Sequence, residues 1–324
     1  GNARSSLPPI RKGALAPLKF RGRIADFPDM SGPPPQIDMQ TRSQWRHLFP
    51  AKEWGRLMQR RLASEATQVA THRDPAGHVE LRQALAAHLA PARGIVASEH
   101  QILITNGTQE SLNIMARLFV DRDTTVAVEN PCYGPAAFAF ESYGAKLLPV
   151  NVEEDGLDLD NLAKLKFDLI YTTPAHQFPT GVTMTVEQRQ RLLELAWNSN
   201  AYIIEDDYDG DFRYDGPPLR SLRATDTNGC VIYLGSFSQT LGAGVRIGFM
   251  VLPFELIEPA IAVKSLLNKG NSWANQVVLA DMIESGSYMR HLRRTRSIYL
   301  GNRNNLIRAL KTAFDDVQLY GEDG

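Results

Sequence analysis

The chain has 324 residues, with 35 lysines and arginines against 36 aspartates and glutamates, so its formal net charge is −1. A composition of 43% hydrophobic and 22% charged residues is typical of a globular protein, and this length favours a large domain with a smaller one. The near-zero charge excludes a basic surface over the whole chain and leaves only a local patch for nucleic acid. The sequence contains no apolar run long enough to span a membrane, and we expect a cytoplasmic protein.

The first 23 residues differ in composition from the rest of the chain. They contain six lysines and arginines, three prolines and no acidic residue, without a helical or strand period. We interpret residues 1–23 as a basic linker or arm. Both a connector to an upstream domain and a simple chain terminus fit this composition.

From about residue 77 the sequence predicts alternating strands and helices. The apolar runs 101–105, 125–128, 146–150, 168–172, 202–206 and 230–236 are typical of buried strands, and segments such as 186–199 have a helical period. This alternation predicts an α/β fold with a mainly parallel sheet covered on both faces. Ligands of such sheets bind beyond the carboxyl ends of the strands, so the ligand-binding residues are expected there.

The first strand is followed by a sequence suited to an anion. Gly107, Thr108 and Gln109 open a predicted helix, whose free N–H groups and dipole attract a phosphate. A helix cap supplied by Asn106 or Thr108 explains the same residues without a ligand.

The next strand ends carry aromatic and polar side chains. Tyr133 follows the second predicted strand and either stacks on a flat ring or packs in a turn. After the strand at 168–172, a Pro-Thr-Gly turn presents the preceding His176 and Gln177 toward the crevice at the strand ends. The cysteines Cys132 and Cys230 match no zinc or redox spacing, and we expect no metal site.

Asp206 ends the strand at 202–206. A carboxylate at the end of a buried strand is costly unless it meets a cation or a strong donor, and a protonated pyridine nitrogen is such a donor.

These motifs together resemble the fold of the pyridoxal 5'-phosphate (PLP)-dependent aminotransferases of the aspartate aminotransferase type. More narrowly, the strings HQFPTG and EDDYDGDFRYDG resemble the aminotransferase-like domain of MocR/GabR-type transcriptional regulators, over roughly residues 20–324. The resemblance implies a segment 24–75 packed on the large domain, a large PLP-binding domain over 76–262, and the start of a smaller, here incomplete, α/β domain over 263–324.

The resemblance also assigns roles to single residues. It implies that Asp206 pairs with the pyridine nitrogen, with Asp207 as the fallback, that Tyr208 binds the ring hydroxyl and that Tyr133 stacks on the ring. His176 and Gln177 would line the other ring edge. The phosphate would be held by Gly107, Thr108, Gln109, Ser236, Ser238 and Arg246.

One departure from the family pattern decides the chemistry. The family has a lysine after Ser-Phe-Ser that forms a Schiff base with PLP, and Gln239 stands there instead. A carboxamide is neither a nucleophile nor a base, so we expect non-covalent PLP and no ordinary transamination. An engineered substitution, a natural pseudoenzyme and a relocated lysine are three open explanations, with Lys264 and Lys269 as the nearest downstream lysines.

A second departure lies at the carboxyl end. A long helix is expected near 285–314, followed by a strand beginning at VQLY (317–320). Family members continue into a small domain whose arginine binds the substrate carboxylate, so that arginine would lie beyond Gly324.

The leading functional hypothesis is the effector-sensing and dimerisation domain of a MocR-type regulator. It implies a homodimer, an amino-acid or amine effector, and contact with DNA only through a winged-helix domain upstream of this chain. The alternative is a free-standing PLP-dependent aminotransferase captured as a lysine-to-glutamine variant. A third hypothesis is a dimerising pseudoenzyme that binds no PLP.

Overall fold

The computed structural model describes residues 47–71, 74–214, 220–319 and 321. The predicted linker at 1–23 and most of the predicted segment 24–75 lie outside the described residues. Residues 35–324 belong to one compact unit.

An eight-stranded sheet forms the centre of the described residues, in the order β1-β8-β7-β6-β5-β2-β3-β4. Strands β2, β3, β5, β6 and β7 run parallel, whereas β8 is antiparallel to both β1 and β7, and β4 is antiparallel to β3. The strands are β1 (Ile102–Thr105), β2 (Thr125–Asn130), β3 (Lys146–Glu153), β4 (Gly156–Leu157), β5 (Leu169–Thr172), β6 (Tyr202–Asp207), β7 (Val231–Ser236) and β8 (Gly248–Val251).

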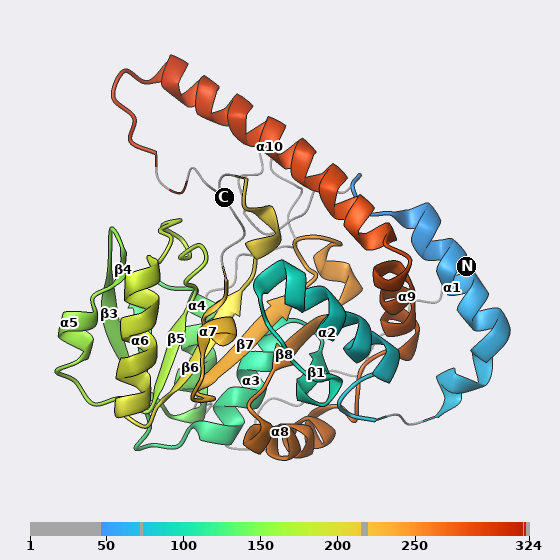
Figure 1. The fold of residues 1–324 in the computed structure, drawn as a ribbon, viewed down its shortest axis with the longest axis horizontal. Helices are drawn as coiled ribbons and strands as arrows, with labels where there is room; N and C mark the ends of the chain where they lie inside the picture. Colours follow the sequence, from blue (N-terminus) through green and yellow to red (C-terminus); the bar gives the residue numbers. More distant parts are fainter. Residues whose placement is uncertain (1–46, 72–73, 215–219, 320, 322–324) are drawn as a thin grey trace, which may run out of the picture. The chain divides into compact units, whose positions relative to one another are not determined.

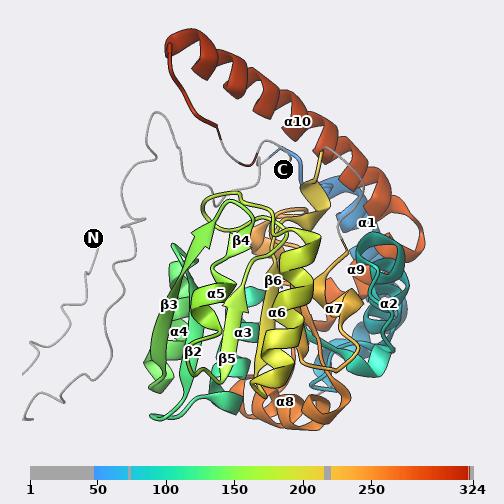
Figure 2. The same cartoon turned by 60° about the vertical axis from the view of Figure 1, so that its left-hand side comes forward.

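Helices cover both faces of this sheet (Figures 1 and 2). One face packs against α3 (Thr108–Phe119), α4 (Gly134–Tyr143) and α8 (Phe254–Leu267). The opposite face packs against α2 (Val79–Arg93), α5 (Leu159–Leu162), α6 (Val186–Asn198), α7 (Leu222–Thr225) and α9 (Trp273–Glu284). The two remaining α-helices of the described residues are α1 (Ala51–Glu65), which packs on α9, and α10 (Ser287–Ala313). We refer to these faces as the α3 face and the α2 face.

Strand alternation assigns the core side chains to the two faces. Tyr171 of β5 and Ile204 of β6 are register partners and both pack in the α3-face core. Ile203 and Tyr233 pack on the α2 face. Because side chains of successive strand residues point to opposite faces, residues 204 and 206 share the α3 face and residue 207 belongs to the α2 face.

The predicted α/β fold with a mainly parallel sheet is confirmed. All six predicted strands form, and the helix predicted at 186–199 is α6. The predicted strand at 317–320 is wrong for residues 317–319, which have no regular structure, while Tyr320 lies outside the described residues. An apolar run forms a strand only when another strand pairs with it, and none of the described strands pairs with residues 317–319.

Two helices, α9 and α10, come before the last described residues. Helix α9 packs against α1 and α2, and α10 follows it across Gly286. Figure 1 shows α10 running along the outside of the unit. The division at residue 263, which falls within α8, stays a prediction. None of the helices in the described ranges is both long and apolar enough to cross a membrane.

Candidate cofactor site

The carboxyl end of β6 places two adjacent carboxylates on opposite faces of the sheet. Asp206 accepts a hydrogen bond from the Tyr171 hydroxyl at 2.8 Å on the α3 face. Asp207 accepts from Arg93 Nε at 2.5 Å and from the Tyr233 hydroxyl at 2.6 Å on the α2 face. The expectation that only one of the two acids points into a given crevice agrees with this alternation.

Asp206 is an incompletely satisfied buried acid. Its side chain is 3% exposed, and Oδ1 has no hydrogen-bond partner among the described residues, whereas Oδ2 has Tyr171. Burial raises the pKa of Asp206 to about 7, although the Tyr171 hydrogen bond acts in the opposite direction. A cation beside Oδ1 would return this carboxyl to its ionised form.

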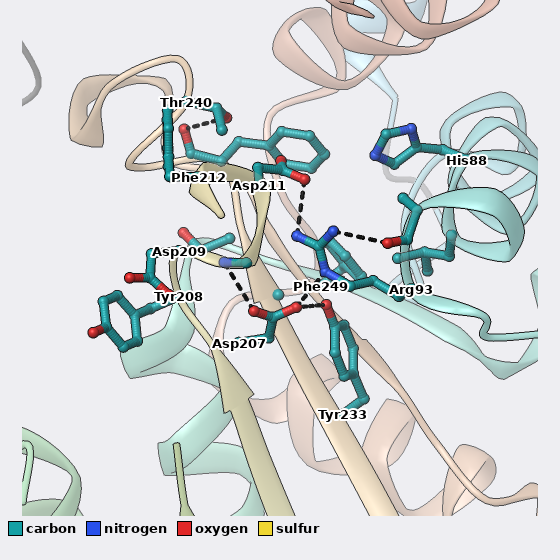
Figure 3. Close-up of a pocket in the computed structure, with 16 residues that line it drawn as sticks. His88, Arg93, Asp207, Tyr208, Asp209, Asp211, Phe212, Tyr233, Thr240 and Phe249 are labelled. Atoms are coloured by element: carbon teal, nitrogen blue, oxygen red, sulfur yellow. Dashed lines mark hydrogen bonds and ion pairs between the residues drawn. The ribbon is translucent and has the colours of Figure 1, made fainter. Parts of the chain in front are cut away.

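Asp207 is instead fully occupied by protein groups. Burial alone would raise its pKa, but Arg93 and the hydrogen bonds of Tyr233 and the Gly210 N–H hold the pKa below its usual value. Arg93 also binds Asp211 at 2.8 Å, and Tyr288 of α10 donates to the other oxygen of Asp211 at 3.0 Å. Figure 3 shows the contacts of Arg93 with Asp207 and Asp211 in a pocket on the α2 face, with Tyr208 directed away from Arg93.

The amino end of α3 forms the opposite end of the candidate site. Helix α3 begins at Thr108 with Gly107 as its N-cap, and no side chain caps it. The capping role considered for Asn106 or Thr108 is therefore not observed. A Cβ on Gly107, whose φ is 106°, would lie 3.7 Å from Nη1 and 3.8 Å from Nη2 of Arg246. An exposed guanidinium beside uncapped helix N–H groups is a phosphate-binding arrangement.

Two further residues of the predicted phosphate site lie at the end of β7. Ser236 Oγ donates to Ser238 Oγ at 2.9 Å and accepts from the Ser238 N–H at 3.1 Å. Gly248 of β8 is the register partner of Ser236, and a Cβ there would lie 2.6 Å from Gly107 Cα. This close approach places the Ser236 segment next to the amino end of α3.

Tyr133, Phe178 and Tyr208 form an aromatic cluster. Tyr133 and Phe178 pack edge-to-face with centroids 5.7 Å apart, and Phe178 and Tyr208 do the same at 5.9 Å. Tyr133 directly precedes α4, and both tyrosines are half-buried. They can therefore present a ring face and a hydroxyl to a flat ligand.

His176 and Gln177 are both buried, with their polar groups directed at protein atoms. His176 Nδ1 lies 3.1 Å from Asp209 Oδ1. The Gln177 amide donates to Glu129, to Pro131 O and to Phe178 O, and its oxygen accepts from the N–H and hydroxyl of Thr180. These bonds hold the loop bearing Tyr133 against the loop bearing Phe178, and contact of either side chain with a cofactor ring stays a prediction.

Gln239 is half-buried and makes no hydrogen bond with any described residue. The nearest downstream lysine with a described side-chain contact is Lys264 of α8, which is 0% exposed. Its Nζ lies 3.1 Å from Glu110 Oε1 and 3.3 Å from Asn268 Oδ1. The Lys264 ammonium thus forms an ion pair with Glu110, in the first turn of α3.

Taken together, the described residues fit PLP. The unpaired Oδ1 of Asp206 suits a pyridinium, and the cradle of Gly107 and Arg246 suits the phosphate. Thr108 and Gln109 form the first residues of α3, and Ser236 and Ser238 follow β7. The roles of the single residues remain predictions.

Two residues of the site were missed by sequence reasoning. Tyr171 supplies the donor to Asp206, and Glu129 accepts from Thr172, Thr173 and Gln177 at 2.6 to 3.1 Å. The sequence did show a tyrosine inside an apolar strand and a glutamate at the end of another strand. Because buried polar groups need hydrogen-bond partners, both residues could have been expected to bind other polar groups of the site.

Comparisons with known proteins agree with this geometry. The sequence profile of the aminotransferase class I and II family matches residues 40–324. The chain is 36% identical over 290 residues to the uncharacterized HTH-type transcriptional regulator YhdI of Bacillus subtilis, covering 89% of this chain and 62% of that protein. It is 38% identical over 251 residues to the probable rhizopine catabolism regulatory protein MocR of Rhizobium meliloti, covering 78% and 51%.

A solved structure is similar as well. The kynurenine aminotransferase of Pyrococcus horikoshii, in complex with PMP, has a TM-score of 0.79 and 30% identity, covering 83% of this chain and 69% of that one. The chain thus spans less than two thirds of the length of the two regulators.

Proposed function

The chain belongs to the aminotransferase class I and II family, and we propose that it is the PLP-binding, effector-sensing and dimerising part of a MocR-type transcriptional regulator. The family and its structural neighbours imply PLP as the cofactor. Similarity to two regulators, each longer than this chain, supports a DNA-binding domain outside it.

The observation that carries this proposal is Gln239. PLP supplies an electrophilic aldehyde that condenses with primary amines. A carboxamide cannot provide that amine, and Lys264 is buried in its ion pair with Glu110. The chain therefore holds PLP only through non-covalent contacts, with its aldehyde available to an incoming amine.

The residues of the site can bind and orient PLP, but position 239 provides no catalytic base. Asp206 pairs with the pyridinium nitrogen at one end, and Arg246 with the amino end of α3 holds the phosphate at the other. Tyr133 and Tyr208 fix the ring between these ends. Such a site binds an amine or amino acid without turning it over.

Helix α10 contacts the segment that carries Gln239. Tyr288 contacts Thr240 Oγ1 at 3.3 Å, and His291 Nε2 lies 2.7 Å from Thr240 O. Thr240 directly follows Gln239, so a shift of the 236–240 segment on ligand binding moves the contacts of α10. A ligand acts this way only if it binds two arrangements with different affinity.

The test is a titration of the purified protein with PLP, followed by absorbance with and without added primary amines. We expect saturable PLP binding and a spectral change that depends on the amine. Absence of any PLP binding would favour a dimerising pseudoenzyme and overturn the proposal.

A specific observation also favours the aminotransferase alternative. The Asp206 and Arg246 ends of the site are both present, and a 30%-identical aminotransferase shares the fold. Gln239→Lys should restore turnover of an amino acid and a keto acid if this chain is such an enzyme. An inactive but PLP-binding Gln239→Lys protein supports the regulator.

A further inference from the structure

Helix α10 carries a concentrated positive charge, whereas the rest of the chain has 28 basic and 36 acidic residues, a net charge of −8. Over 27 residues it contains no aspartate or glutamate, and its seven basic residues are Arg290, Arg293, Arg294, Arg296, Arg303, Arg308 and Lys311. The whole chain has a net charge of −1. The local basic patch that the composition left open is therefore on this helix.

The basic residues of α10 divide between a packed side and an exposed side. Tyr288, Leu292 and Thr295 are buried against the unit. Arg303 lies over the Tyr214 ring at 5.5 Å. The side opposite these buried residues carries a stripe of polar, basic and small residues at helical spacing, namely Arg290, Arg293, Arg294, Ser297, Gly301, Asn304, Asn305, Arg308, Lys311 and Thr312. Met289 and Leu306 of the same helix are also exposed.

The three arginines at the amino end of this stripe lack acidic partners. Arg290, Arg293 and Arg294 are exposed, and no carboxylate of the described ranges forms an ion pair with them. Some other exposed arginines do form ion pairs, such as Arg56 with Glu53 and Arg191 with Asp160. A row of unpaired guanidiniums next to small and amide side chains is a surface for an external polyanion.

We propose that this face of α10, from Arg290 to Lys311, binds the phosphate backbone of duplex DNA. The stripe is about 30 Å long at 1.5 Å per residue, which suits a polymer with one charge per about 1.7 Å of axis. An anionic membrane is disfavoured, because the basic stripe itself carries no apolar side chain that could enter a bilayer. The inference rests on the proposed regulator function, and it adds a second DNA contact to the one expected only upstream of this chain.

The contact is sequence-independent. Guanidiniums on phosphates position a protein on DNA without reading bases, and the upstream domain would supply the specificity. If the operator bends or wraps against α10, a shift of α10 would reach the effector site through the contacts of this helix with Thr240.

The test compares two triple variants of the full chain by fluorescence anisotropy with a 30-base-pair duplex of arbitrary sequence. The first is Arg290→Gln, Arg293→Gln and Arg294→Gln. The matched control is Arg117→Gln, Arg122→Gln and Lys164→Gln, which removes the same charge from exposed positions on other elements. The six basic residues of 1–23 are common to all three proteins.

We expect the plot of log affinity against log salt to lose about 2 to 3 units of slope in the α10 variant, because each phosphate contact contributes about 0.9. The control should keep the slope. No duplex binding at low salt, or an equal loss in both variants, would overturn the inference. A changed sedimentation coefficient of the α10 variant with unchanged DNA binding would overturn it too and indicate an interface between copies. PLP titration of the same proteins tests the proposed cofactor function separately.

Discussion

Asp206 and Asp207 are consecutive residues of β6, yet their carboxylates are bound by tyrosines of different strands on opposite faces of the sheet. The Tyr171 hydroxyl of β5 donates to Asp206, and the Tyr233 hydroxyl of β7 donates to Asp207. Arg93 neutralises Asp207, whereas Asp206 has one oxygen without a described partner. One acid is thus structural, and the other is available to a ligand.

The two acids should respond differently to replacement by alanine. Asp206→Ala should weaken PLP binding by about 2–4 kcal/mol, because a desolvated charge pair is lost. Asp207→Ala should leave most of the PLP affinity but lower the free energy of unfolding by about 3–5 kcal/mol, since the buried Arg93 loses one of its two acid partners and keeps only Asp211. PLP titration and urea denaturation of both variants measure this. Loss of PLP binding in Asp207→Ala with retention in Asp206→Ala would reverse the assignment.

The two tyrosines provide a finer pair of variants. Tyr171→Phe removes a hydrogen bond that favours the ionised form of Asp206, so the pKa of Asp206 should rise further. We expect PLP affinity to fall by about 0.5–1.5 kcal/mol, which is the usual value of one hydrogen bond. Tyr233→Phe is the matched control, because it removes the same group from Asp207. Equal PLP affinities of the two variants would contradict a role for Tyr171 in the site.

Stability without PLP should depend on pH through Asp206. Burial raises its pKa from 3.8 to about 7 in the folded protein, so between pH 4 and 7 the folded state holds a proton that the unfolded state has lost. This contribution to stability is complete below about pH 4 and is lost as the pH rises to 7, at up to about 1.4 kcal/mol per pH unit.

The Asp206→Asn variant isolates this effect. Its free energy of unfolding should fall less steeply between pH 4 and 7 than that of the parent, measured by urea denaturation in the absence of PLP. Glu205, whose pKa burial also raises to about 7, remains in both proteins and contributes equally. Parallel pH profiles of the two proteins would show that Asp206 is ionised when folded.

The phosphate end of the site can be tested through Gly248. Gly248→Ala places a Cβ 2.6 Å from Gly107 Cα, so the backbone at the amino end of α3 must shift from its present position beside Arg246. We expect PLP affinity to fall about tenfold, or about 1.4 kcal/mol. Gly244→Ala is the control, since nothing lies within 4 Å of its added Cβ. A phosphate site elsewhere would leave the affinity of Gly248→Ala equal to that of the control.

Much of the fold could be predicted from the sequence, because the buried parallel strands are short apolar runs such as 168–172 and 202–206. The strand ends with their polar residues followed from the same pattern. The hydrogen-bond partners of those residues could not be predicted in this way, because the Tyr171–Asp206 contact depends on the register of β5 and β6. The saturation of Gln177 and the ion pair of Lys264 with Glu110 likewise depend on contacts between segments distant in sequence.

The most direct measurement concerns how PLP is held when position 239 is glutamine. The protein is saturated with PLP, treated with borohydride and analysed by intact mass, next to Gln239→Lys as the control. We predict an unmodified mass for the parent and a stable pyridoxyl adduct for Gln239→Lys. A pyridoxyl group on any lysine of the site in the parent protein would contradict non-covalent binding and show that another lysine has replaced the missing one.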